Sequence, residues 1–182
     1  MSTLTRSDRY SKLSITLHWL MALVIVATFA AIELRENYPR GSDIREAFKT
    51  WHFMLGLSVL ALVIVRIAAR LMTPSPAELP EPAWRKWTSK ATHLALYALM
   101  LGLPIAGWMI LSAAGKPIPF FGLELPPLIG PNKDLAGEIK ELHELGAEIG
   151  LWLVGLHALA ALFHHYVLKD GVLLRMMPRR SA

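Results

Sequence analysis

The histidines are the residues of this chain whose type and spacing point to a chemical role, because each of four charge-free segments contains at least one histidine. His143 and His157 are fourteen positions apart, and fourteen residues of helix rise about 21 Å and return to within about 40° of the same face. Two imidazoles then lie on one helix face near opposite sides of a bilayer, which is the spacing that two stacked haems need. An imidazole in hydrocarbon is costly unless something holds it, so this pair indicates a functional site.

The segments that must position these histidines are long and apolar. Residues 13–32, 51–65, 91–115 and 149–168 carry no charged side chain. Three of them reach 20 residues or more, which is enough to cross a hydrocarbon core of about 30 Å. The second extends to residue 72 if the side chains of Arg66 and Arg70 snorkel to the membrane surface or find a buried partner. We therefore predict an all-α membrane protein with one domain over residues 1–182, a four-helix up-down-up-down bundle holding two haems. The expected helices cover about 13–34, 50–72, 89–113 and 136–168.

The connections are rich in helix breakers, and the chain has no cysteine. Residues 73–82 contain four prolines, which predicts a rigid extended link. Residues 115–131 contain five prolines and three glycines, which predicts an irregular loop over the outer mouth of the bundle. The lack of cysteine removes disulfides, iron–sulfur clusters and the covalent attachment of c-type haem.

The distribution of charge predicts the orientation of the bundle, with both termini cytoplasmic. The inner segments then carry 12 of the 19 Lys and Arg residues and 4 of the 14 acidic residues, which makes them +8 and the outer segments −3. The inner basic residues include Arg9, Lys12, Arg85, Lys86, Lys90, Arg179 and Arg180. The net charge of +5 thus reflects the orientation of the chain in the membrane, and we expect no nucleic-acid partner.

Depth in the membrane pairs the histidines in one way. His52 matches His143 towards the outside, and His18 matches His157 towards the cytoplasm. The alternative for His18 and His52 is an interfacial polar anchor. His93 is the rival of His18 as inner ligand, and is otherwise expected near a haem propionate or a quinone.

Two further positions lie on the faces that carry these histidines. Gly150 is midway between His143 and His157, where a missing side chain would favour helix packing or let two macrocycles approach the backbone. Arg66 is fourteen residues after His52, at the depth of the inner haem. It is expected to pair with a propionate or to snorkel to the interface.

A third group follows the inner ligand along the fourth helix. His164, His165 and Lys169 lie on the cytoplasmic side, where they could donate hydrogen bonds and protons to a quinone. Lys90 and His93 are the next candidates for that site. The alternative is an interfacial belt that includes Tyr166.

Several motifs resemble the bacterial cytochrome b561 family over almost the whole chain. They are Tyr10–Lys12, Leu17–Trp19, Trp51–His52, Gly155–Ala158, Leu162–Tyr166 and Leu174–Pro178. The resemblance implies a multi-pass protein of the bacterial inner membrane with two haem b, bound by His18, His52, His143 and His157. It also implies electron exchange with ubiquinone and oxidation of superoxide at the outer face.

This resemblance predicts a superoxide:quinone oxidoreductase whose partners are membrane lipid, quinone, and superoxide or another electron donor. Local cations would guide an anionic donor, with Lys116 and Arg45 foremost. The other outer cations are Arg35, Arg40, Lys49 and Lys133. Two alternatives stay open from the residues: a haem b relay subunit of a membrane dehydrogenase or hydrogenase, and a haem-free transporter whose histidines relay protons.

Overall fold

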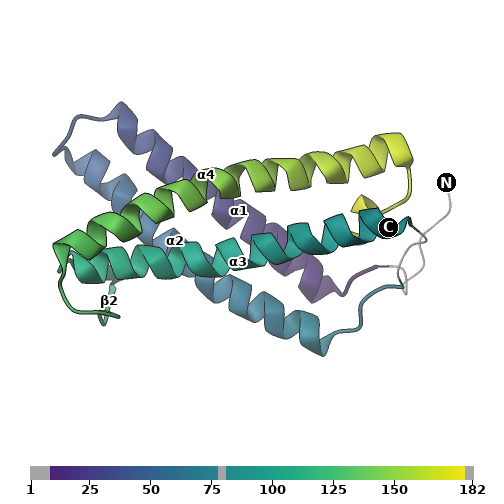
Figure 1. Ribbon diagram of the computed structural model, residues 1–182, viewed down its shortest axis with the longest axis horizontal. Helices are drawn as coiled ribbons and strands as arrows, with labels where there is room; N and C mark the ends of the chain where they lie inside the picture. The colour runs from purple at the N-terminus through teal and green to yellow at the C-terminus, as the bar shows by residue number, and fades with distance from the viewer. Residues whose placement is uncertain (1–8, 78–80, 179–182) are drawn as a thin grey trace.

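Four long helices dominate the computed structural model, which describes residues 9–77 and 81–178 (Figure 1). They are α1 (Lys12–Leu34), α2 (Asp43–Met72), α3 (Ala83–Ala113) and α4 (Lys133–Phe163), and α4 continues into a short π-helix, η3 (His164–Leu168). All four are long and apolar enough to cross a membrane. The predicted all-α, four-helix membrane architecture is confirmed.

Three of the helices begin earlier than expected, because polar first turns are helical where a cap is present. α2 begins at Asp43 after the Ser42 hydroxyl, which accepts the backbone N–H of Arg45. α4 begins at Lys133 after the Asn132 side chain, which accepts the N–H of Leu135. Caps of this kind satisfy the free N–H groups of a first turn. The charge-free stretches therefore mark the membrane-buried part of each helix and underestimate its length.

The segment between α3 and α4 was predicted to be irregular, and that prediction was wrong for its centre. β1 (Ile118–Phe120) and β2 (Leu123–Leu125) pair antiparallel, with Ile118 opposite Leu125. The turn residues Phe121 and Gly122 have φ values of 48° and 86°, as two-residue β-hairpins with a right-handed twist require. Proline is compatible with this sheet because both strands are edge strands.

The four helices form two helix pairs that cross each other (Figure 1). α1 packs along α2, α3 packs along α4, and the contact of α2 with α3 joins the pairs. Over the described residues, α4 has no comparably extensive contact with α1 or α2. Side chains on the inward face of α4 therefore meet those of α1 and α2 across a less densely packed interior.

The two ends of the bundle are built differently. At one end, which we call the terminal end, the N–H of Tyr10 donates to the carbonyl of Arg175 in η4 (Leu173–Met176), at 3.3 Å. At the other, the β-hairpin end, lie β1–β2 and the short helix η2 (Arg35–Asn37). Arg179, Arg180 and residues 78–80 of the predicted extended link lie outside the described residues.

Two glycines of α4 lie against α3. A Cβ at Gly146 would lie 2.9 Å from Cδ2 of Leu103, and a Cβ at Gly150 would lie 3.7 Å from Cδ1 of Leu99. Small residues allow membrane helices to pack at short distance. The close approach depends on Gly146, because the distance at Gly150 is an ordinary contact, and both roles expected for Gly150 stay predictions.

Replacing Gly146 with valine should therefore destabilise the α3–α4 pair. Overpacking of this kind costs about 1–3 kcal/mol, so we expect the apparent Tm in detergent to fall by several degrees. Gly155→Val is the matched control, because a Cβ at Gly155 meets nothing within 4 Å. Circular dichroism melts of the two variants test this, and equal melting temperatures would contradict it.

Candidate functional site

Two pairs of imidazoles connect α4 with the other helix pair. The ring centroids of His52 and His143 are 6.3 Å apart with an interplanar angle of 79°. Those of His18 and His157 are also 6.3 Å apart, with an angle of 78°. The structure thus brings together the two pairs that depth in the membrane predicts. Each pair joins a histidine of α4 to one of α1 or α2, across the interior where those helices contact little else.

The separation of the rings suits one metal ion between each pair. A metal–imidazole bond is about 2.0 Å and the ring centre lies about 1.1 Å behind the nitrogen, so two imidazoles on opposite sides of one metal have centroids about 6.2 Å apart. Both observed pairs meet this value. The residues present therefore fit bis-histidine ligation of haem iron.

His52 of the outer pair has the bonding that metal ligands show, and His143 does not. Nδ1 of His52 lies 3.0 Å from the carbonyl oxygen of Thr28. A carbonyl only accepts, so Nδ1 carries the hydrogen and Nε2 keeps its lone pair for a metal. Over the described residues, Nδ1 of His143 is buried with no hydrogen-bond partner. A Cβ at Gly107 would lie 3.5 Å from Cε1 of His143, so glycine gives this ring room beside α3.

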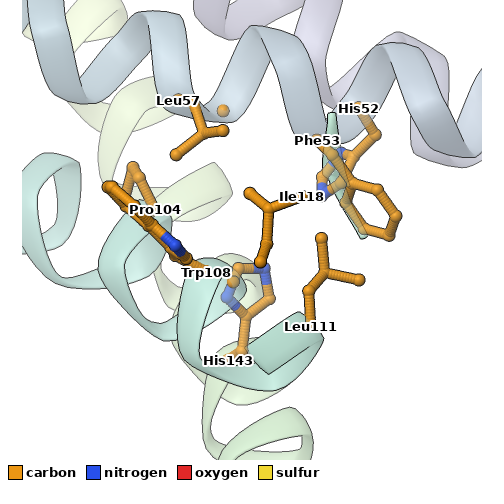
Figure 2. A pocket seen from close by; sticks show the side chains of 10 residues that line it. His52, Phe53, Leu57, Pro104, Trp108, Leu111, Ile118 and His143 are labelled. Atoms are coloured by element: carbon orange, nitrogen blue, oxygen red, sulfur yellow. The ribbon is translucent and has the colours of Figure 1, made fainter. Parts of the chain in front are cut away.

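A mostly apolar pocket surrounds the outer pair, as Figure 2 shows. Apolar walls with a few convergent polar groups are the common form of cofactor pockets. Ile118 of β1 is 2% exposed and packs with Leu57 of α2 and Leu111 of α3, so the β-hairpin closes the pocket at its end of the bundle. The pocket is lined by His52, Phe53, Gly56, Leu57, Pro104, Gly107, Trp108, Leu111, Ile118 and His143.

A third imidazole lies beside the inner pair. The ring centroids of His93 and His157 are 5.6 Å apart, which is less than the separation expected for two ligands of one iron. The ring centroids of His18 and His157 have the expected separation. The geometry therefore favours His18 as the partner of His157.

Arg66 reaches from α2 to the carbonyl of Ser14 on α1, at 3.2 Å and one turn before His18. This bond brings a cation towards the inner pair, and its pairing with a propionate stays a prediction.

The predicted quinone residues at the end of the fourth helix have different surroundings. His164 is half-buried, and its Nδ1 is bonded to a carboxylate oxygen of Asp170. The ring of His165 packs edge-on against Tyr166, with centroids 4.8 Å apart. Lys169 is exposed and takes a left-handed backbone conformation. Sequence reasoning missed Asp170, although the Asp170-Gly171 dipeptide after the fourth helix was a signal for a reversal of the chain.

Arg45 is a structural residue of the α1–α2 turn, which argues against the guidance role predicted for it. Its guanidinium donates to the carbonyls of Arg35 and Tyr38, at 3.0 and 2.9 Å. It also donates to both carboxylate oxygens of Glu36, at 3.0 and 2.9 Å. The charge of Arg45 is therefore compensated, and only 14% of its side chain is exposed.

The other outer cations divide into paired and unpaired groups. Arg35 pairs with Glu36, and Lys49 with Glu46. Within residues 9–77 and 81–178, no ion pair involves Arg40, Lys116 or Lys133. Lys116 is exposed directly before β1, and it is the predicted guidance residue that the structure leaves free.

Four membrane helices that bring two pairs of imidazoles into their interior are the features of a membrane b-type cytochrome. The sequence model of the family described as prokaryotic cytochrome b561 matches residues 9–179, and the chain belongs to this family. The predicted resemblance is confirmed, and with it membrane electron transfer and a multi-pass location in a bacterial membrane. Family membership implies that haem b is bound, which argues against the haem-free transporter.

Individual relatives agree with this assignment. Cytochrome b561 homolog 1 of Escherichia coli (strain K12) is 39% identical over 175 residues, covering 96% of this chain and 99% of that protein. A Yersinia pestis protein named probable superoxide oxidase CybB is 40% identical over 173 residues, covering 94% of this chain and 97% of its own length. Cytochrome b562 of Cereibacter sphaeroides is 32% identical over 181 residues, covering 97% and 100%.

Removing the Arg45 side chain should destabilise the α1–α2 turn. Hydrogen bonds from a charged group contribute about 1.5–3 kcal/mol each where they are buried, and less where the partner is as exposed as Glu36. We expect Arg45→Met to lower the apparent Tm by several degrees. Arg40→Met removes the same charge from the same turn without these bonds, so it should leave the Tm unchanged. Equal effects of the two variants on thermal melts would contradict the structural role.

Proposed function

We propose that this protein oxidises superoxide at the β-hairpin end and reduces ubiquinone at the terminal end. Two superoxide anions lose one electron each and become two molecules of dioxygen. One quinone takes up both electrons and two protons and becomes the quinol. The observation that carries the proposal is the stacking of two histidine pairs along α4, each with ring centroids 6.3 Å apart. The relative named probable superoxide oxidase CybB supports the choice of donor.

Two haem b would be held by these pairs, one by His52 with His143 and one by His18 with His157. Haem b, when bound, supplies an iron that carries one electron at a time. The protein's part would be to hold each haem through its two histidines and to tune those ligands. The bond from Nδ1 of His52 to the carbonyl of Thr28 orients that ring and makes its Nε2 a better ligand. Arg66 would place positive charge beside the inner haem, where a propionate needs a partner.

The direction of transfer follows from the proposed orientation in the bacterial inner membrane. The terminal end is rich in Lys and Arg, which favours the cytoplasmic side, so the β-hairpin end would face the periplasm. Superoxide formed outside the cytoplasm would meet the outer haem first. The short connections at that end offer only small docking surfaces, which favours a small donor over a large dehydrogenase partner.

An anionic donor needs local positive charge, because the outer segments are net negative. Lys116 supports such guidance, since it is exposed and close in sequence to Ile118, which lines the outer pocket. Arg40 and Lys133 are the other unpaired cations of the described outer segments. A few unpaired cations within a Debye length of the pocket focus an anion even where the net charge opposes it.

Quinone reduction is proposed at the terminal end, beside the inner pair. His164, His165, Lys169 and His93 are the candidate donors to the quinone oxygens. His164 is half-buried, and the exposed His93 lies against His157, with ring centroids 5.6 Å apart. Water at the cytoplasmic surface would supply the two protons.

The first test of this function is the haem content. We expect two haem b per chain with low-spin bis-imidazole spectra, measured by the pyridine haemochrome assay and by absorption spectroscopy. His157→Ala should lose the inner haem alone. His93→Ala is the matched control, since its ring also lies against His157 but should leave both haems in place. One haem per chain would contradict the proposal. If His93→Ala loses the inner haem and His18→Ala keeps it, the inner ligand is His93 and not His18.

The second test is the dependence of superoxide oxidation on salt. If Lys116 guides superoxide, haem reduction by superoxide should slow as ionic strength rises, because the Debye length is only about 10 Å at 0.1 M. Lys116→Glu should slow it several-fold further while quinone reduction stays unchanged. Lys140→Glu makes the same charge change where Glu144 already compensates the lysine, so it should have a smaller effect.

Stopped-flow spectroscopy gives both rates. A rate that rises with salt would mean that the net negative charge dominates, which contradicts guidance by Lys116. If superoxide reduces the haems no faster than it disproportionates, the superoxide role fails. The haem b relay for a separate dehydrogenase then takes its place.

A further inference from the structure

The chain reverses sharply directly after α4, and the backbone there is strained. The α-helix widens into the π-helix η3, Lys169 then adopts a φ of 54°, and Gly171 a φ of 79°. A left-handed conformation costs a residue with a side chain roughly 1–2 kcal/mol. π-Helical turns and backbone strain of this kind recur at functional sites. Asp170 lies between the two positive-φ residues, so this strained turn directs the Asp170 carboxylate back towards η3.

The Asp170 carboxylate has two partners that fix its orientation. One oxygen accepts the backbone N–H of Val172 at 3.1 Å, and the other is bonded to Nδ1 of His164. The side chains of His164 and Asp170 are 19% and 26% exposed, so the pair is largely sheltered but reachable from water. Because an ionised carboxylate only accepts hydrogen bonds, Nδ1 carries a hydrogen and Nε2 is left for another group.

Contacts to distant parts of the chain hold this turn in place. Trp19 of α1 donates its indole N–H to the carbonyl of Met176 in η4, at 2.7 Å. Arg175 of η4 donates to the carbonyl of Ala77 after α2, at 2.6 Å. These bonds connect α1, the end of α2 and the turn that contains Asp170. The histidine–carboxylate pair thus belongs to a rigid part of the terminal end, which is the condition for precise positioning.

We propose that Asp170 is a positioning residue for proton transfer to the reduced quinone, acting through His164. This rests on the proposed quinone site. Asp170 holds the imidazole with Nδ1 protonated and stabilises the imidazolium that forms when Nε2 takes up a proton from water. The Nε2–H bond then breaks, and the proton forms an O–H bond on the two-electron-reduced quinone. His164 takes up and releases one proton for each of the two O–H bonds, and Asp170 stays ionised throughout.

Few other charged groups compete for this role. The titratable and charged groups nearest to His164 along the chain are His157 on α4, His165 and Tyr166 on η3, Lys169, Asp170, and Arg175 on η4. The other charged groups of α4 lie between Lys133 and Glu148, at least four turns away along the helix. Lys169 is exposed, and Arg175 is bonded to the Ala77 carbonyl. Within the described residues, Asp170 is the acidic group bonded to a histidine of the terminal end.

The decisive variant is Asp170→Asn. Its amide oxygen still accepts from Val172, but its NH2 group would face Nδ1 of His164 and impose the opposite tautomer. The readout is re-oxidation of the dithionite-reduced, haem-loaded protein by a water-soluble ubiquinone analogue. We expect the saturating rate to fall at least tenfold, on the scale of general acid catalysis, with half-saturation by quinone within twofold of wild type. The descending limb of the pH–rate profile should change as well, because the imidazole is then held in the other tautomer.

Three further variants make the result interpretable. Asp170→Glu keeps the charge and should recover part of the rate. Glu81→Gln removes one exposed negative charge from the terminal end and should leave rate and pH profile unchanged. His164→Gln keeps Asp170 but cannot titrate, so it should lose the descending limb. If Asp170→Asn does not fold with its haems bound, His164→Gln still tests the proposal.

The outcomes separate the two proposals. If His164→Gln slows re-oxidation but Asp170→Asn leaves rate and pH profile unchanged, the role of Asp170 is wrong and the quinone site stands. A slower rate with an unmoved pH profile would make Asp170 a purely structural residue. If His164→Gln with both haems bound reacts with quinone like wild type, the proposed quinone site itself fails.

Discussion

An imidazole inside a membrane protein needs a partner, and this constraint organises the whole bundle. α4 carries His143 and His157 on its inward face, and α3 is the one helix along which α4 packs extensively in the described residues. The partners of the two histidines come from α1 and α2, at the same ring separation in both pairs. Because family membership implies haem b, the cofactor would join the two helix pairs at these imidazoles, in addition to the packing of α2 against α3.

The glycines of α4 and α3 serve this arrangement. Gly146 brings α4 close against Leu103 of α3, while Gly150 and Gly107 lie where these two helices are in ordinary contact. The packing of α4 along α3 fixes the position of α4, and with it the depth of His143 and His157.

The two ends of the bundle are adapted to different chemistry. At the β-hairpin end, most cations are compensated by neighbouring carboxylates, and Ile118 covers the outer pocket with an apolar side chain. At the terminal end, a strained turn and three long-range hydrogen bonds hold a histidine–carboxylate pair close to water. In the proposed function, the first end would admit a small anion, and the second would take up the protons that quinone reduction requires.

The sequence by itself determined the membrane spans and the pairing of His18, His52, His143 and His157 by depth, because these depend on local composition and helical periodicity. Its motifs also identified the family by resemblance. Only the tertiary structure decided what the remaining polar groups do. Arg45, expected to guide an anion, is bonded within the α1–α2 turn, and Asp170, which the sequence did not single out, meets His164. The β-hairpin likewise depends on positive φ at Phe121. Such features arise where the chain reverses direction, and hydropathy and periodicity contain no information on which side chains a reversal brings together.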